Sequence, residues 1–352
     1  MTLLFTVKLT SLAIPCLAFA LCVTAAHGQE SSARMTKNAP PVRIALALHG
    51  GAGTIDRNSM TPEREREYRA GIENALRAGQ EILQTGGSSL DAVQATVRVL
   101  EDDPHFNAGR GSVFTSAGRN EMDAAIMDGK TLRAGAVANV EHVRNPIVLA
   151  RAVMEKSKHV MIAGSGAEEF AKRNGIELVD AKYFFTQRRW DALQKIKAKE
   201  KAGADGTKKF IISEAERHGT VGAVARDSQG NLAAATSTGG TDNKLPGRVG
   251  DSPVIGAGTY AKNATCAVSC TGDGEFFIRA AVAHQVSALM ELRGISLGEA
   301  AEQALGEAEK LGGTGGLIAV DKDGNVALPF NTSGMYRGYL GDNGKLVIEI
   351  YK

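Results

Sequence analysis

Glycine content is the feature of this sequence that most constrains its fold. The chain of 352 residues holds 41 glycines and 9 prolines, and the glycines follow no Gly-X-Y period. A collagen-like fibre is therefore excluded. Glycine is favoured at tight turns and where two backbones approach closely, as they do around small-molecule sites. We therefore expect a globular protein in which glycine-rich loops shape a binding site.

The remaining composition is that of an ordinary globular protein. Hydrophobic residues make up 43% of the chain and charged residues 23%, which argues against disorder as the main state. The formal net charge of +2 gives no basic field for nucleic acid, so no nucleic-acid partner is expected. The length suits one large domain or two smaller ones.

Residues 1–28 have the pattern of a secretory signal peptide. A single charge, Lys8, precedes an apolar stretch from Leu9 to Ala26 that a proline interrupts. Small residues then lead into a polar segment, which predicts cleavage after Gly28. The proline and the small-residue exit disfavour the alternative, a membrane anchor. We expect an exported protein, periplasmic or secreted, that does not engage a membrane once the leader is removed.

Cleavage of the leader would leave two cysteines, Cys266 and Cys270. Four residues apart on an expected strand, they would lie on one face but roughly 13 Å apart. That separation is too large for a disulfide. We expect the exported chain to rely on its core for stability.

Hydrophobic periodicity and glycine punctuation predict alternating groups of helices and strands. Helices are expected from Thr61 to before Gly86, from Ser89 onward, and over 146–156, 166–174, 275–292 and 297–311. Strands are expected over 44–48, 122–127, 134–140, 159–163, 221–226, 232–236, 264–270, 317–320 and 326–328. Paired helices and antiparallel hairpins predict helix layers that sandwich sheets, an α+β fold.

One segment differs in composition from the rest. Residues 187–217 are rich in lysine, contain two glycines and have few apolar residues. Such a run is typical of a solvated segment. We expect a flexible linker over about 187–217.

Several common catalytic motifs do not occur in the sequence. There is no phosphate-binding GxxxxGK[ST] loop, no GxSxG nucleophile turn and no HExxH zinc motif. The histidines lack the spacing of metal ligands, so a zinc site is not expected.

The segment after the lysine-rich run carries the chemistry. It reads HGTVGAVARDSQGNLAAATSTGGTDNKLPGRVGDSPVIGAGTYA from His218 to Ala261. With LHGGAG at Leu48, FNAGRGSVFT at Phe106 and LPFNTSGMYRG at Leu328, it resembles the plant-type asparaginase and isoaspartyl peptidase family. These proteins are N-terminal-nucleophile threonine hydrolases. The resemblance covers nearly all of the chain after the leader, and it implies a four-layer αββα sandwich.

The resemblance also implies autocleavage between Gly219 and Thr220. It would produce an α chain, residues 29–219, and a β chain, residues 220–352, with two such protomers forming a dimer. Thr220 would then carry both a hydroxyl and a free α-amine. The usual pKa of an α-amine, about 7.7–8.0, suits a general base near neutral pH. β-Branching limits the rotation of the hydroxyl.

The remaining site residues are implied by position within the family's motifs. Thr238 would hydrogen-bond the nucleophile, Arg248 and Asp251 would bind the substrate's α-carboxylate and α-ammonium, and Thr271 and Gly272 would stabilise the oxyanion. Gly274 would contact the substrate amine through its backbone, and Asn107 would order the surroundings of the nucleophile. A structural sodium ion would bind the backbone carbonyls of Leu100, Glu101, Asp103, Phe106, Ala108 and Arg110. No cofactor is expected for catalysis.

The expected activity is hydrolysis of the β-amide of isoaspartyl dipeptides and of L-asparagine, releasing L-aspartate. Both substrates carry the same free α-amine and α-carboxylate, so one clamp serves both. Three alternatives remain. A glycosylasparaginase has aspartate before its threonine, where Gly219 stands here. A taspase-like protease would need insertions that are not evident. A non-catalytic exported binding protein would remain a single intact chain.

Overall fold

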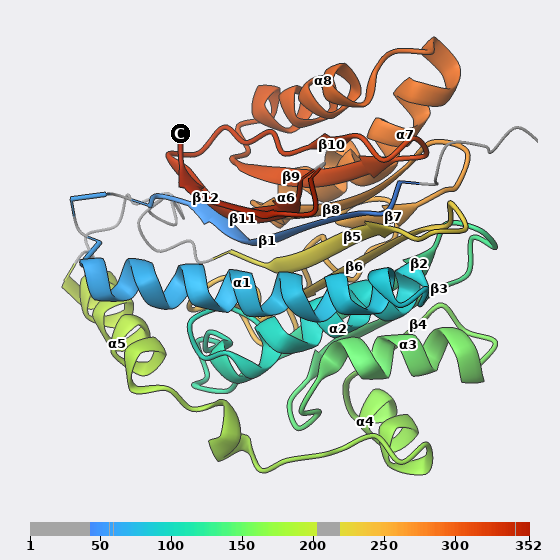
Figure 1. Cartoon of the computed structure of the whole chain (residues 1–352). Coiled ribbons are helices and arrows are strands. Elements are labelled where there is room, and N and C mark those ends of the chain that lie inside the picture. Colours follow the sequence, from blue (N-terminus) through green and yellow to red (C-terminus); the bar gives the residue numbers. More distant parts are fainter. Residues whose placement is uncertain (1–42, 56, 59, 203–218, 342) are drawn as a thin grey trace, which may run out of the picture. The chain divides into compact units, whose positions relative to one another are not determined.

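Two β-sheets face each other in the chain from Pro41 to Lys352, and helices cover their outer surfaces (Figure 1). The computed structural model describes residues 43–55, 57–58, 60–202, 219–341 and 343–352. The expected signal peptide, residues 1–28, lies outside the described residues, and so do residues 203–217 of the expected linker.

Within the described residues, the larger sheet has eight strands in the order β12-β11-β1-β5-β6-β2-β3-β4. Neighbouring strands are antiparallel except for β3 and β4, which are parallel. Their bounds are β1 Ala45–Gly53, β2 Met122–Asp128, β3 Ala134–Val140, β4 Met161–Ala163, β5 Val221–Arg226, β6 Leu232–Thr238, β11 Gly334–Leu340 and β12 Leu346–Tyr351.

The smaller sheet has four strands among the described residues, in the order β10-β9-β8-β7. Their bounds are β7 Thr259–Ala261, β8 Cys266–Gly272, β9 Gly315–Asp321 and β10 Val326–Ala327. β8 and β9 pack against β1 and β5 of the larger sheet. Alanine is frequent between the sheets, as at Ala45, Ala47, Ala234 and Ala267, so the two backbones approach closely.

Helices complete the outer layers. On the larger sheet lie α1 (Pro62–Gln84), α2 (Ser89–Asp102), α3 (Pro146–Lys156) and α4 (Gly164–Arg173); on the smaller lie α6 (Gly274–Ala280), α7 (Val282–Arg293) and α8 (Leu297–Lys310). The expected four-layer αββα sandwich is therefore confirmed. None of the helices in the described ranges is both long and apolar enough to cross a bilayer.

Sequence signals placed the helix starts well. The Thr61 hydroxyl caps α1 by accepting from the Arg64 amide, and Pro62 opens the helix. Ser296 and Glu299 form a reciprocal capping box at the start of α8. Both helices begin where the sequence predicts.

The prediction of a flexible linker over about 187–217 is wrong for residues 187–202. Residues Gln187–Ala202 form a helix, α5, in which Arg189 and Leu193 are buried. The ring of Trp190 lies 5.3 Å from that of Phe114, edge to face. Lysine, alanine and glutamate are good helix formers, so the composition that indicated a solvated linker also suits a helix anchored at its first turns.

Three further expectations need correction. The helix expected over 275–292 is two helices, because Ala281 adopts a left-handed conformation with φ 49°. β1 continues through Gly53, five residues beyond the end of the strand expected over 44–48. Strands β7, β11 and β12 were not predicted. Cys266 and Cys270 are both buried and free, as expected, with no disulfide in the described part of the chain.

Candidate active site

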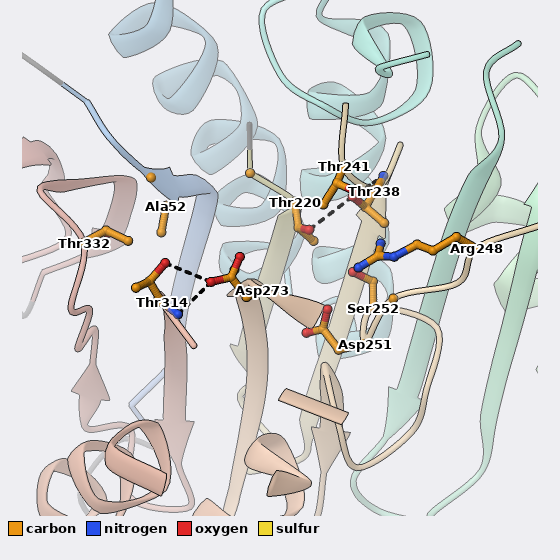
Figure 2. Close-up of a pocket in the computed structure, with 15 residues that line it drawn as sticks. Ala52, Thr220, Thr238, Thr241, Arg248, Asp251, Ser252, Asp273, Thr314 and Thr332 are labelled. Carbon is orange, nitrogen blue, oxygen red and sulfur yellow. Dashed lines mark hydrogen bonds between the residues drawn. The ribbon is translucent and has the colours of Figure 1, made fainter. Parts of the chain in front are cut away.

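Thr220 lies directly before β5, in the middle of the larger sheet between β1 and β6. Its side chain is buried, and its hydroxyl donates to the Thr238 hydroxyl at 3.1 Å. Thr238 is the last residue of β6, and its hydroxyl also accepts from the Gly240 amide at 2.9 Å. The pairing of β5 with β6 thus brings the two threonines together (Figure 2).

Gly219 crosses β1 at very short range. A Cβ on Gly51 would lie 2.5 Å from the Gly219 Cα, and Gly51 has a φ of +113°. A Cβ on Gly219 would lie 2.1 Å from the Gly51 Cα. Any side chain at either position would push the Gly219–Thr220 peptide away from β1, so both positions require glycine.

A small, partly open pocket of about 30 Å³ lies over these residues. Its lining comes from loops and strand ends of both sheets: Ala52, Gly53, Gly219, Thr220, Thr238, Gly240, Thr241, Arg248, Gly250, Asp251, Ser252, Gly272, Asp273, Thr314 and Thr332. In the view of Figure 2, Arg248 and Asp251 lie to one side of Thr220, and Asp273 and Thr314 to the other.

The structure brings Arg248 and Asp251 together as the sequence predicts. The Arg248 guanidinium binds both carboxylate oxygens of Glu275, at 2.9 and 2.8 Å. Asp251 is buried, and its Oδ2 has no hydrogen-bond partner among the described residues. Burial raises the pKa of Asp251 to about 7, although the positive charge of Arg248 acts in the opposite direction. Asp251 lines the pocket, where a bound cation would favour its ionised form.

Gly274 lies against both of these side chains. A Cβ there would be 2.9 Å from the Asp251 Oδ1 and 3.0 Å from an Arg248 terminal nitrogen. The missing side chain keeps the space between the two charged groups open.

Thr271 and Gly272 end β8 beside the pocket. Gly272 lines it. Thr271 is fully buried, and its hydroxyl accepts from the Ala52 amide at 3.3 Å, so its own proton remains to be donated. Asn107 lies behind the pocket wall, where its Nδ2 donates to the Gly240 carbonyl at 2.7 Å and its Oδ1 accepts from the Val113 amide at 3.0 Å.

The expected sodium loop closes tightly on itself. A Cβ on Gly109 would lie 2.3 Å from the Glu101 carbonyl oxygen, and one on Gly111 would lie 2.0 Å from that of Phe106. Carbonyl oxygens are hard, neutral ligands of the kind that an alkali cation prefers. Among the described residues, no group of His, Cys, Asp and Glu side chains could hold a metal ion.

Sequence reasoning missed part of the site. The Asp273 carboxylate accepts from both the amide and the hydroxyl of Thr314, at 2.8 and 3.0 Å, and joins β8 to β9 at the pocket wall. Asp273 and Thr314 are 41 residues apart, so no local motif indicates this pair. His49, whose Nδ1 lies 2.8 Å from the Thr220 carbonyl oxygen, was also not predicted, because HGGAG alone is a weak motif.

A four-layer αββα sandwich with a threonine at the start of a central strand defines the class of N-terminal-nucleophile hydrolases. Within this class, the family described as asparaginase matches residues 42–349. The chain belongs to that family.

Curated relatives cover most of the chain. The isoaspartyl peptidase of Escherichia coli (strain K12) is 54% identical over 85% of this chain and 94% of its own length. The putative isoaspartyl peptidase/L-asparaginase of Dictyostelium discoideum is 50% identical over 88% and 99%. The isoaspartyl peptidase/L-asparaginase of Mus musculus is 45% identical over 88% and 93%.

Proposed function

We propose that this chain is an autocleaving threonine amidohydrolase. It hydrolyses the β-amide of isoaspartyl dipeptides and of L-asparagine and releases L-aspartate. The observation that carries the proposal is the contact of Thr220 with Thr238, at 3.1 Å, in a pocket that also holds Arg248 and Asp251. The names of the relatives, isoaspartyl peptidase and isoaspartyl peptidase/L-asparaginase, support the substrate class.

Activation begins with the Thr220 hydroxyl. Its oxygen attacks the Gly219 carbonyl carbon, and the C–N bond to the Thr220 nitrogen breaks as that nitrogen takes up the hydroxyl proton. Water then hydrolyses the resulting ester, which leaves a carboxylate on Gly219 and a free amine on Thr220. The close crossing of Gly51 and Gly219 holds this peptide against β1.

Substrate binding follows from charge. Arg248 binds the α-carboxylate, which shares the guanidinium with Glu275, and the Asp251 carboxylate binds the α-ammonium. The β-amide then points toward Thr220. The clamp holds only the aspartyl part, so ammonia or an amino acid can serve as the leaving group.

The same hydroxyl performs catalysis. The Thr220 oxygen attacks the β-carbonyl while the Thr220 amine takes its proton, and the Thr271 hydroxyl and the Gly272 amide donate to the oxyanion. The amine returns the proton to the leaving nitrogen, and water hydrolyses the acyl ester to aspartate. Every step uses groups of the chain, so the chemistry needs no cofactor.

Denaturing gel electrophoresis with N-terminal sequencing tests activation. We expect two bands, the shorter beginning Thr-Val-Gly-Ala-Val. A Thr220→Ala variant should stay a single folded chain and be inactive. Two bands from that variant, or an intact and inactive wild-type chain, would sink the proposal; the latter result would favour a non-catalytic binding protein.

Assays of product release test the substrate class. We expect L-aspartate from a β-aspartyl dipeptide and from L-asparagine, and much less from N4-(β-N-acetylglucosaminyl)-L-asparagine. A preference for the sugar amide would assign the chain to the glycosylasparaginases instead.

Three finer points belong to the same proposal. A sodium ion held by the carbonyls of the 100–110 loop would raise the melting temperature in sodium chloride relative to choline chloride.

Two cleaved protomers form a dimer, and sedimentation tests this oligomeric state. The leader directs export, and fractionation of cells with sequencing of the mature N-terminus tests that.

A further inference from the structure

A buried histidine lies directly behind the proposed nucleophile. His49, in β1, is fully buried, and its Nδ1 lies 2.8 Å from the carbonyl oxygen of Thr220. Its Nε2 lies 2.9 Å from the hydroxyl of Ser269, in β8 of the other sheet. The proposed mechanism gives His49 no role, yet it contacts the residue that performs every step.

The partners of His49 fix its tautomer. Burial lowers the pKa of His49 to about 3, although the hydrogen bond to the Thr220 carbonyl acts in the opposite direction, so the ring is neutral at working pH. A neutral imidazole has one N–H. The Thr220 carbonyl only accepts, so Nδ1 carries the proton and donates, and Nε2 accepts from the Ser269 hydroxyl.

From His49 a row of hydroxyl groups continues between the sheets, and each hydroxyl donates to the group before it. Because Ser269 donates to His49, its oxygen accepts from the Thr236 hydroxyl at 2.8 Å. The Thr259 hydroxyl in turn donates to that of Thr236 at 2.6 Å. A hydroxyl has a single proton, so this row of hydrogen bonds ends at Thr259 and does not include the loop that carries Arg248 and Asp251.

The sequence keeps space for this row. Gly222 in β5 is the register partner of His49. A Cβ on Gly222 would lie 2.0 Å from the Ser269 hydroxyl and 2.6 Å from the His49 Nε2. Only glycine at this position permits the contact between histidine and serine.

We propose that His49, with its tautomer set by Ser269, is a positioning residue that holds the Thr220 carbonyl and so orients the nucleophile's hydroxyl and amine. This inference rests on the proposed function. Fixing the carbonyl fixes the rotation of the Thr220 backbone, and with it the directions in which Oγ1 and the amine point. The clamp formed by Arg248 and Asp251 makes separate contacts, so loss of the row should lower kcat more than it raises KM.

Kinetics of purified, cleaved variants on a β-aspartyl dipeptide test the proposal. His49→Leu removes both hydrogen bonds at similar volume, and a misplaced reacting group can cost about 100-fold in rate. We expect a fall in kcat of that order, with KM within about threefold, and slower cleavage at Gly219. His49→Asn, whose amide nitrogen matches Nδ1, should recover at least about tenfold of that loss. Ser269→Ala should give an intermediate kcat.

The matched control is Ser287→Ala. Ser287, in α7, pairs with Thr265 at 2.6 Å and is equally buried, but this helix packs on the outer side of the smaller sheet. The substitution should lower the melting temperature while leaving kcat unchanged. A kcat within twofold of wild type in folded His49→Leu would overturn the proposal. So would equal kcat losses in Ser269→Ala and Ser287→Ala, a result that also decides the matter if His49→Leu fails to fold.

Nitrogen-15 NMR of histidine-labelled Thr220→Ala protein tests the tautomer without any turnover. We expect a neutral, Nδ1-protonated His49 from pH 5 to 8, and a mixture of tautomers once Ser269→Ala is added. An Nε2-protonated or charged ring contradicts the inference and leaves the proposed function untouched. Failure of the proposed function would appear instead as wild-type protein that neither cleaves nor hydrolyses.

Discussion

At the scale of single residues, the pocket buries a side chain that must carry a charge. Asp251 is almost fully buried beside Arg248, yet one of its oxygens has no partner in the described part of the chain. Leaving such a carboxylate charged is costly. A substrate ammonium removes that cost, so the burial of Asp251 favours the binding of a zwitterion.

The pH dependence of turnover should expose this balance. In the free enzyme Asp251, whose burial raises its pKa to about 7, must be ionised, and the Thr220 amine must be neutral. Both conditions fail as the pH falls, so log kcat/KM should drop below pH 7 with a slope approaching 2. Bound substrate keeps Asp251 ionised, so log kcat should drop with a slope of 1. A single ionisation in both profiles contradicts this assignment of Asp251.

Thr238 offers a test on the other side of the pocket. Thr238→Val keeps the shape but removes the oxygen that accepts from Thr220 and from the Gly240 amide. An unpaired buried donor costs about 1–3 kcal/mol, so kcat should fall roughly 10- to 100-fold. Ser237→Ala is the control, since that hydroxyl donates to Glu101 on the opposite face of the sheet. An unchanged kcat in Thr238→Val would exclude the contact from catalysis.

At the scale of elements, the sequence predicts the features that depend only on neighbouring residues. The caps at Thr61 and Ser296 and the antiparallel hairpin of β5 and β6 follow from short-range preferences, and the sequence predicts them. Ala281 gives no such signal, because its left-handed conformation is imposed by α6 and α7 packing on the smaller sheet. β11 contains Gly334 and Gly338, which weaken strand propensity, and it was missed.

The break at Ala281 predicts a stabilising substitution. Ala281 is exposed and has a φ of 49°, which costs an L-residue roughly 1–2 kcal/mol relative to glycine. The greater freedom of unfolded glycine offsets about half of that. Ala281→Gly should therefore raise the free energy of unfolding by up to about 1 kcal/mol in urea titrations of the uncleaved Thr220→Ala chain.

Gly294 gives the reverse control for this prediction. It ends α7 at φ 66° with open space around its missing side chain. Gly294→Ala should lower the free energy of unfolding by about 1 kcal/mol. A loss of stability in Ala281→Gly would show that packing, and not backbone strain, governs this junction.

At the scale of the whole molecule, the site is assembled from distant parts of the chain. Thr220, Arg248 and Asp251 were predictable because the strings that carry them are specific. His49 was not, since its role depends on β1 pairing with β5 and facing β8 across the sandwich. The Asp273–Thr314 pair likewise needs β8 beside β9. Such contacts depend on sheet order, which hydrophobic periodicity does not encode.

Sheet order also decides what a cut at Gly219 does to the protein. Strands β1, β2, β3 and β4 precede the cut, and β5, β6, β11 and β12 follow it. In the sheet they alternate in blocks, with β1 between β11 and β5, and β6 paired with β2. The two products therefore share the hydrogen bonds and the core of one sheet. We expect them to co-elute on size exclusion in native buffer and to separate only in denaturant.

This alternation changes the reaction order of refolding. The uncut chain folds by a unimolecular process, so Thr220→Ala protein diluted from denaturant should recover its circular dichroism at the same rate at every concentration. The mature enzyme must first bring two different polypeptides together, so its recovery should slow in proportion to dilution and yield less product when dilute. Equal, concentration-independent rates for both would mean that the fragments never part. If the rates differ as expected, hydrolysis of this one peptide bond changes how reversibly the protein unfolds. The intact chain assembles efficiently once, before activation, and each later unfolding event is hard to reverse.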